Sequence, residues 1–542
     1  MAGEDEIQFA EPIIHRLQSF LTGKEAAQTT IVSKSWHSAW LTRPNLDFDD
    51  TYFGEYSCYS IDKFKNHAKK TIKRYEQSNL KIESFHLCMQ IDQYGRDDLA
   101  KKLIVKALRI GTTRLCIRLI TKNKSFVLPN EVFGADNLVE LSVSGCRIKL
   151  DDRVVIKFRK LKSLSLDDDM HISIDTVSKI VSSCPCIEKF SLLSNFYPND
   201  EFDRRVSAWG RAVDTLIPND EKVVGLVDTL IPKLRCLVLG YVPFKTLCLG
   251  DLLFRFPFLK DFTLYINYNC CGHYFEEGLQ ISNCSLERIK LVLQGFECCT
   301  NNRKPRVKFD VPSVRKFTFE GAVIPRLSFT SKPPSREWES HVSIIRCPRR
   351  EHGFSTIWFN ELSELLTGLS RSKTHLSLNV SCNMMSINYK AGNQIIQGLH
   401  KHELENLSID MTNLPSLSCY ALFDGLFRLC RPKLITQYYK DGPDKQLYNL
   451  CHINDSNYME KTKFDFLCQT LEEGINFKVS RPTQFMYGLN DLEEVNAQTF
   501  DMNDVPAEWK PIPFESLIDA DTPYKHVQAK IRTRLLLKWK PI

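Results

Sequence analysis

One apolar pattern recurs along this chain and constrains its fold more than any other feature. The pattern is an apolar residue, two free positions, a second apolar residue, one free position and a third apolar residue. Because its last two apolar positions alternate with period two, each copy predicts a short strand with one buried face. The clear copies are Leu138/Leu141/Val143, Leu161/Leu164/Leu166, Ile187/Phe190/Leu192, Leu234/Leu237/Leu239, Leu259/Phe262/Leu264, Leu286/Ile289/Leu291, Val314/Phe317/Phe319 and Leu404/Leu407/Ile409.

The spacing of the copies predicts a repeat architecture. The central residues at 141, 164 and 190 lie 23 and 26 residues apart, and those at 237, 262, 289 and 317 lie 25, 27 and 28 apart. These distances fall within or near the range of leucine-rich repeats, roughly 20–29 residues. The alternative is an ordinary α/β domain with chance triplets, but near-constant spacing over two separate runs favours a stacked solenoid.

The segments between triplets are predicted to be helical, which makes the fold class α/β with strand–helix repeats. Thr176–Ser183 places Val177, Ile180 and Val181 on one helical face, and 251–258 has a similar pattern. Weaker copies of the triplet are Ile82/Phe85/Leu87, Phe244/Leu247/Leu249, Ile324/Leu327/Phe329 and the pair Leu376/Leu378. Each unit cannot bury its apolar face alone, so neighbouring units are expected to stack.

The domain organisation follows from where the repeat is present. We predict a small N-terminal domain over 8–50, a repeat solenoid over 51–430 and a C-terminal region over 431–542 whose fold the sequence does not assign. Two insertions interrupt the solenoid, a polar one near 195–230 and a proline-containing one near 332–353 that is interpreted as loop. In the C-terminal region 528–539 is predicted to be a strand and 499–513 a loop.

The N-terminal domain is predicted to be a small helical module. Pro12 suits the first turn of a helix, and the apolar residues after it through Leu21 form one stripe. The segment 24–41 is a second helical region, with a predicted break near Ser33. Since two short helices cannot bury both stripes between themselves, one face is left for a partner or for the solenoid that follows.

Composition excludes several classes of protein. Lys and Arg exceed Asp and Glu by 7 in 542 residues, which does not suggest a polybasic nucleic-acid binder. The first nine residues carry three acidic residues and no apolar core, so an ordinary secretory signal is not expected. The 19 cysteines are therefore expected to be reduced thiols in the cytoplasm or nucleus. No apolar run approaches 18 residues, so no membrane span is predicted.

The N-terminal segment resembles the F-box of the plant F-box/leucine-rich-repeat family. Lys24-Glu25-Ala26, Thr29, Val32-Ser33-Lys34, Trp36, Trp40 and 44–49 fall on the family pattern without gaps. Two positions depart from it, since the usual Leu-Pro opening is Phe9-Ala10 and the proline after the first helix is Thr22. The repeats, with Cys184-Pro185-Cys186 before a strand, resemble those of the same family, so the resemblance spans roughly 9 to 430.

The resemblance implies a substrate-recognition subunit of an SCF-type cullin-RING ubiquitin ligase. It implies a three-helix F-box that docks on a Skp-type adaptor, and through it a cullin, while the repeats bind a protein substrate. The chain itself is then not an enzyme. The residues on which the family pattern places adaptor contacts are Ile13, Ile14, Leu17, Leu21, Val32 and Trp36. The departures from the pattern motivate an alternative, a non-catalytic repeat scaffold with a decayed F-box.

No catalytic or cofactor constellation is visible in the sequence. It contains no Gly-rich phosphate loop and no nucleophile elbow, and neither a cofactor nor a metal is predicted. Cys270-Cys271 with His273, and Cys298-Cys299, are adjacent cysteines that point to opposite faces of a strand, which argues against a shared zinc ion. We predict neither nucleic-acid nor membrane partners, and nothing in the repeats indicates a small-molecule ligand.

Overall fold

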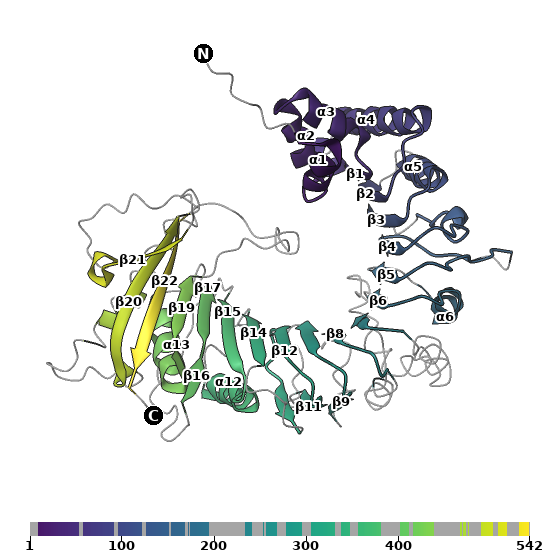
Figure 1. The fold of residues 1–542 in the computed structure, drawn as a ribbon. Coiled ribbons are helices and arrows are strands. Elements are labelled where there is room, and N and C mark those ends of the chain that lie inside the picture. The colour runs from purple at the N-terminus through teal and green to yellow at the C-terminus, as the bar shows by residue number, and fades with distance from the viewer. Residues whose placement is uncertain are drawn as a thin grey trace, which may run out of the picture. The chain divides into compact units, whose positions relative to one another are not determined.

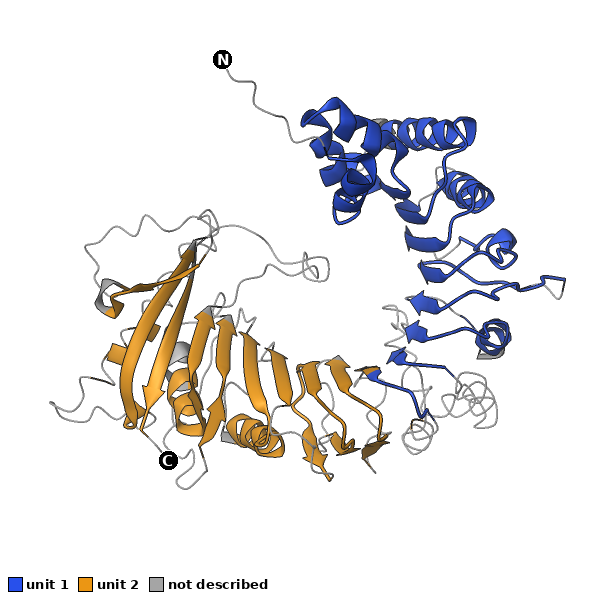
Figure 2. Ribbon diagram, viewed as in Figure 1, with its two compact units in different colours: residues 1–248, 255–261 blue, residues 249–254, 262–542 orange. Residues whose placement is uncertain are grey.

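The structure is a computed structural model, and it forms two compact units (Figure 2). Unit 1 comprises 1–248 and 255–261, and unit 2 comprises 249–254 and 262–542. The structure describes residues 9–53, 58–91, 96–121, 126–150, 153–167, 172, 174–193, 233–240, 253, 256–267, 278–294, 305–330, 338–346, 356–380, 401–410, 416–437, 467–468, 470–472, 475, 489–501, 508–517 and 531–540. The predicted insertion at 195–230, the weak triplet at 244–249, most of the predicted helix at 251–258 and the paired cysteines near 270 and 298 lie outside these residues.

Unit 1 begins with a small helical module and continues as a parallel sheet. Its helices are α1 (Glu11–Gln18), α2 (Gly23–Gln28), η1 (Thr29–Ile31), α3 (Lys34–Thr42), η2 (Asp50–Phe53), α4 (Cys58–Gln77), α5 (Arg96–Ile110), η3 (Asn130–Val132) and α6 (Ile174–Ser182). Its strands are β1 (Asn45–Asp49), β2 (Ser84–Ile91), β3 (Arg114–Thr121), β4 (Glu140–Ser144), β5 (Ser163–Asp167), β6 (Lys189–Leu193) and β7 (Cys236–Gly240). The predicted break in the second helical region is confirmed, because Ser33 is the N-cap of α3.

The seven strands of unit 1 pair in parallel in chain order from β1 to β7 (Figure 1). Equivalent positions of successive triplets are register partners, as in Leu141, Leu164 and Phe190. All three are at most 2% exposed. The helix predicted at 176–183 is confirmed as α6, and its Val177, Ile180 and Val181 are buried. The apolar triplet therefore predicted both the strands and the face that they bury.

Unit 2 continues the parallel strand arrangement and adds a second short sheet. Its strands are β8 (Asp261–Asn267), β9 (Leu279–Ser282), β10 (Arg288–Gln294), β11 (Arg306–Asp310), β12 (Lys316–Gly321), β13 (Arg326–Phe329), β14 (Glu339–Arg346), β15 (Lys373–Val380), β16 (His402–Leu404), β17 (Asn406–Asp410), β18 (Cys430–Pro432), β19 (Leu434–Gln437), β20 (Leu492–Asp501), β21 (Trp509–Ile512) and β22 (Ile531–Trp539). Its helices include α12 (Thr356–Gly368), α13 (Ser416–Leu429) and η6 (Phe514–Leu517).

The prediction of a helix in every repeat is wrong for part of unit 2. Strands β9 and β11 occupy segments where helices were expected, and they pair in parallel with β13 as a separate three-stranded sheet. The reason is visible in β11, whose residues alternate between exposed and buried with period two instead of the helical 3.6. Phe309 and Phe329 stack across this sheet with ring centroids 4.8 Å apart. The weak triplet ending at Phe329 is thus a strand, but of this second sheet.

The predicted loop at 332–353 is wrong over its central part. Glu339–Arg346 forms β14, which pairs in parallel with β12 and β15. The triplet is hidden because Ser340 occupies the central buried position, in register with Phe317. The Ser340 hydroxyl is fully buried and hydrogen-bonds the hydroxyls of Ser372 (2.6 Å) and Thr374 (3.0 Å). A buried hydroxyl with partners on the neighbouring repeat replaces an apolar side chain here.

The C-terminal region adds antiparallel strands to the repeat sheet. The strand predicted at 528–539 is confirmed as β22, which pairs antiparallel with both β19 and β20. The loop predicted at 499–513 is wrong over 499–501, the end of β20, and over Trp509–Ile512, which is β21. Among the described strands β21 pairs with β20 alone. Proline is tolerated on such an edge strand, so Pro511 did not prevent strand formation. None of the helices in the described ranges is long and apolar enough to cross a membrane.

Candidate functional site

The N-terminal module owes its shape to the two faces of α1. Pro12 starts this helix, where its missing N–H costs no hydrogen bond. Ile14 and Gln18 lie on one face of the helix and are buried, whereas Ile13 and Leu17 lie on the other and are exposed. Because i and i+4 residues share a helical face, these two pairs separate a core side from a solvent side. The core side of α1 packs on α3.

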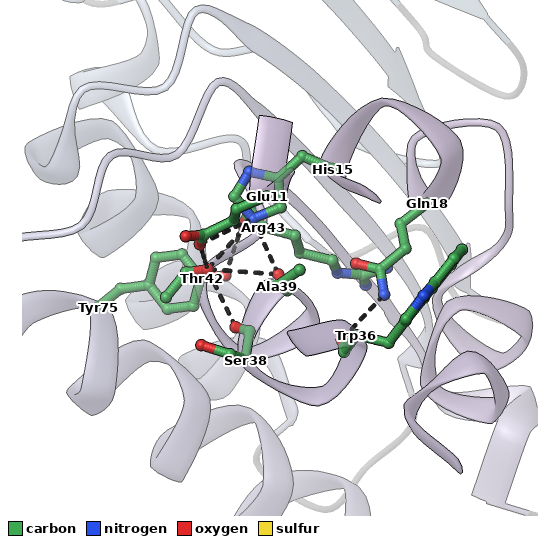
Figure 3. A network of polar contacts seen from close by, with 9 residues as sticks. All are labelled: Glu11, His15, Gln18, Trp36, Ser38, Ala39, Thr42, Arg43 and Tyr75. Atoms are coloured by element: carbon green, nitrogen blue, oxygen red, sulfur yellow. Dashed lines mark hydrogen bonds and ion pairs between the residues drawn. The ribbon is translucent and has the colours of Figure 1, made fainter. Parts of the chain in front are cut away.

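A polar network holds α1 against the end of α3 (Figure 3). The His15 Nε2 lies 3.0 Å from the Ala39 carbonyl oxygen and 3.1 Å from the Thr42 hydroxyl. The Thr42 hydroxyl donates to the Glu11 carboxylate at 2.8 Å. The Ala39 carbonyl oxygen lies in the last turn of α3, where backbone carbonyls lack N–H partners within the helix, and the Thr42 hydroxyl also approaches it at 3.4 Å. These contacts fix the angle between the two helices.

A second contact point uses a buried amide. The Gln18 side-chain nitrogen donates to the Trp36 carbonyl oxygen at 3.3 Å (Figure 3). It also donates to the Thr29 hydroxyl at 3.0 Å. Gln18 is only 1% exposed, and replacing it with an apolar residue removes both of these hydrogen bonds. The amide therefore ties α1 to both η1 and α3 at a single point.

The turn between α1 and α2 is closed by a capping box. The Thr22 hydroxyl accepts from the Glu25 backbone N–H, and the Glu25 carboxylate accepts from the Thr22 backbone N–H at 2.9 Å. These Thr22 hydrogen bonds lower the pKa of the Glu25 carboxyl. Threonine at 22, a departure from the family pattern, thus has a local structural role. The next residue, Gly23, donates to the Asp47 carboxylate at 2.9 Å, and a Cβ there would lie 3.0 Å from that carboxylate.

The module is anchored to the repeats that follow it in unit 1. Tyr75 on α4 is fully buried, and its hydroxyl donates to the Arg43 carbonyl oxygen at 2.6 Å, just beyond the C-terminus of α3 (Figure 3). Burial raises the pKa of Tyr75, so the phenol remains a neutral donor. Arg74 places its guanidinium 5.9 Å from the centre of the Trp40 ring. Trp40 is therefore partly buried against α4.

Exposed apolar side chains concentrate on this module. Among the described residues eleven large apolar side chains are exposed, and seven of them lie between residues 9 and 32. They are Phe9, Ile13, Leu17, Phe20, Leu21, Ile31 and Val32. Exposed apolar residues scattered singly are normal, but a concentration on one small module marks an interaction surface. Ile31 is the most exposed of them, at 90%.

The six predicted adaptor-contact residues separate into three groups. Ile13, Leu17, Leu21 and Val32 are exposed, and we call these four the docking surface. Trp36 is partly buried, with its carbonyl oxygen bonded to Gln18. Ile14 has no exposed area at all, so its predicted role requires correction, because as folded here it presents no surface to a partner. It is a core residue of the module instead.

Two further exposed apolar residues of the module were not among the predicted contacts. Phe20 and Ile31 are 70% and 90% exposed, and neither was among the six predicted contacts. Phe20 was visible as part of the apolar stripe of α1, so its position was the available signal. Ile31 lies in the 3-10 turn η1 between α2 and α3, where the helical period does not hold. Arg16 places its guanidinium 4.8 Å from the centre of the Phe20 ring and covers one side of it.

The comparisons with known proteins agree with the resemblance seen in the sequence. A putative F-box/FBD/LRR-repeat protein of Arabidopsis thaliana is 28% identical over 191 residues, 35% of this chain and 41% of the relative. An FBD-associated F-box protein of the same plant is 28% identical over 195 residues, covering 35% and 43% of the two chains. An F-box/LRR-repeat protein is 29% identical over 201 residues, covering 35% and 37%. No family model matches the chain.

All three of these relatives are named as F-box proteins. They confirm that the chain is similar to plant F-box/leucine-rich-repeat proteins. The matched stretch spans about two fifths of the length of these curated relatives. The fold agrees with the repeat part of this class, since parallel strands from successive repeats form the sheet of each unit.

Proposed function

We propose that the chain is the substrate-recognition subunit of an SCF-type cullin-RING ubiquitin ligase and that its N-terminal module is an F-box that docks on a Skp-type adaptor. The observation that carries this proposal is the docking surface, a set of exposed apolar side chains on a folded helical module with a well-packed core. An amphipathic helix pair of this kind buries its apolar face in a groove of a partner. The named relatives support the same assignment.

The core of the module positions the docking surface. His15 and Gln18 fix α1 on α3, so Ile13 and Leu17 are held on the solvent side of a rigid helix. A preformed apolar face loses little conformational entropy on binding, which favours a stable complex. Trp36 then contributes through packing beside the surface, and Ile14 through the core beneath it.

The repeats are proposed to hold a protein substrate on the exposed face of their parallel sheets. Along each strand the residues between the buried apolar positions face the opposite side, as Ser142 and Ser165 do in adjacent strands. Catalysis then belongs to the other subunits, and this chain acts by raising the concentration of substrate lysines near a ubiquitin-loaded partner. We propose the cytoplasm or the nucleus as its location and no nucleic-acid or membrane partner.

The test is co-purification of the full chain with a Skp-type adaptor. Leu17→Asp places a charge on the docking surface at a residue that is 40% exposed. Ile357→Asp is the matched control, because Ile357 is an exposed apolar residue on α12 of unit 2, 66% exposed. We expect the wild type and Ile357→Asp to retain the adaptor, and Leu17→Asp to lose it with an unchanged circular dichroism spectrum.

The opposite result separates the two candidate functions. If folded wild-type chain retains no adaptor, the ligase assignment fails and the alternative, a repeat scaffold with a decayed F-box, becomes the working function. If Leu17→Asp and Ile357→Asp both retain the adaptor, the chain binds it by a surface other than the one defined here. A localisation experiment with a fluorescent fusion tests the proposed compartments.

A further inference from the structure

Three chemically complementary side chains lie in one row across the parallel sheet of unit 1. Asp47 on β1 is the register partner of His86 on β2, and His86 is the register partner of Cys116 on β3. Each sits between two buried apolar residues of its own strand, so each points to the opposite, exposed face of the sheet. The row therefore presents a carboxylate, an imidazole and a thiol side by side, from residues 39 and 30 positions apart in the chain.

Hydrogen bonds join the three groups. The His86 Nδ1 lies 2.6 Å from the Asp47 carboxylate, and the His86 ring is also hydrogen-bonded to the Cys116 thiol. The carboxylate is itself held by the Gly23 backbone N–H at 2.9 Å and the Tyr52 hydroxyl at 3.1 Å. A nucleophile bonded to a base, with the base oriented by a third group, is the arrangement that activates a thiol.

The positive charges around Cys116 favour the thiolate form of its side chain. The hydrogen bond to Asp47, followed by the one to Cys116, raises the pKa of His86 to about 10, so the ring is a cation at neutral pH. Arg114 and Arg118 flank Cys116 on its own strand at i−2 and i+2, and so lie on the same face. Cations near a thiol favour the thiolate, the reactive form of cysteine. The other ionisable groups near this row are Asp49 on β1, Tyr52 on η2, Cys88 on β2 and Glu140 on β4.

Cys116 differs from most described cysteines in its access to solvent. Cys88, Cys184 and Cys430 are buried, and burial raises the pKa of each thiol to about 12, which makes them inert at neutral pH. Cys116 is half-buried, and Cys284 is exposed. Cys116 thus combines a basic partner with an open approach from the exposed face of the sheet.

We propose that Cys116 and His86 form a thiolate–imidazolium pair, in which His86 has taken the thiol proton and Asp47 positions the ring, and that Cys116 is the site of covalent modification by small soft electrophiles. The His86 ring holds the thiol proton while the sulfur attacks. With iodoacetamide a sulfur–carbon bond forms, the carbon–iodine bond breaks and iodide leaves. With hydrogen peroxide a sulfur–oxygen bond forms, the oxygen–oxygen bond breaks, sulfur gives up two electrons, and the departing hydroxide takes the proton from His86 to form water. This proposal is independent of the adaptor-binding function.

The test compares two cysteines within the same folded molecule. The full chain is labelled with a limiting amount of iodoacetamide between pH 6 and 9, digested and analysed by peptide mass spectrometry. Because the thiolate is the nucleophile, we expect Cys116 to react roughly tenfold faster than the more exposed Cys284 at pH 6, with a shallower rise in rate toward pH 9. If Cys116 reacts no faster than Cys284 at any of these pH values, the proposal is overturned.

Two variants separate activation from simple exposure. His86→Gln is expected to lower the Cys116 rate to that of Cys284 or below. His375→Gln is the matched control, a partly exposed strand histidine of unit 2 that stacks on His341, and is expected to leave the Cys116 rate unchanged. If His86→Gln does not fold, the wild-type rate ratio at pH 6 alone decides.

Separate arms identify the electrophile. In one arm the chain is treated with hydrogen peroxide and then with dimedone, which labels sulfenic acid. In the other arm it is treated with an α,β-unsaturated aldehyde, whose carbon adds directly to the thiol sulfur. Adduct on Cys116 ahead of Cys284 in either arm supports the proposal and names the class of electrophile. Adduct that favours Cys284 in both arms refutes it.

Discussion

Replacing Ile14 with alanine is expected to destabilise the N-terminal module, whereas the same change at Ile13 is not. The two isoleucines are neighbours on α1, but Ile14 has no exposed area and Ile13 is 49% exposed. They therefore differ in burial and in little else. The pair tests whether the structure assigns the faces of α1 correctly.

The size of the effect follows from burial. Truncating a fully buried isoleucine to alanine removes three methyl or methylene carbons and leaves a cavity, which costs about 2–3 kcal/mol in a small module that is able to relax partly. Truncating a half-exposed isoleucine costs within about 0.5 kcal/mol. At a factor of ten for every 1.4 kcal/mol, Ile14→Ala raises the open fraction of the module roughly 30- to 150-fold.

Hydrogen exchange measured by mass spectrometry on the full chain is the suitable assay. Global unfolding of a chain of 542 residues does not report one two-state transition, whereas exchange reports each segment separately. We expect faster exchange in α1 and α3 for Ile14→Ala only, with unit 2 unchanged. Equal protection in the two variants, or faster exchange in Ile13→Ala, contradicts the assigned faces.

Three further changes test other parts of the structure. His86→Gln is expected to lower the stability of unit 1 most below about pH 6.5 and progressively less up to about pH 10. The pKa of His86 is raised in the folded state, so its ion pair with Asp47 stabilises fully below the unfolded pKa and is lost as pH rises through the folded pKa. Unfolding of unit 1 followed at several pH values checks this. Gly425→Ala is expected to disrupt the packing of α13 on α12, because its Cβ would lie 2.1 Å from the Phe359 ring, at a cost of about 1–3 kcal/mol measurable by exchange in both helices. Arg431→Met removes the bond to Asp491 at 2.5 Å and the bond to the carbonyl oxygen of residue 540 at 3.0 Å, so limited proteolysis is expected to release the C-terminal peptide faster, and an unchanged rate counts against this anchor.

Much of the strand arrangement was predictable because it depends on local periodicity. Every clear triplet falls on a strand of a parallel sheet, and its apolar residues are buried, as in Leu141 and Phe317. The prediction failed where a polar residue takes the central position. Ser340 is buried in β14 because hydroxyls of the next repeat receive it, and those partners are 32 and 34 residues away in the chain.

The candidate docking site was predicted in part. The apolar stripe and the family pattern predicted that the N-terminal segment is an interaction module, and four of the six predicted contact residues are exposed. The stripe could not separate Ile13 from Ile14, because adjacent residues differ by 100° around the helix and the choice of buried side depends on where α3 packs. Only the contacts of His15 and Gln18 with α3 set that side.

The sequence alone determined the repeat, its period, the face each predicted strand buries and the helical nature of the first module, because all of these are patterns of nearest neighbours and of period 2 or 3.6. Only the tertiary structure decided which residues far apart in the chain lie side by side. It placed Asp47, His86 and Cys116 in one row, because parallel strands set equivalent positions of successive repeats side by side. It also set β22 against β19, where Leu535 pairs with Ile435 across a hundred residues, because the edge of a sheet accepts a strand from any distance along the chain.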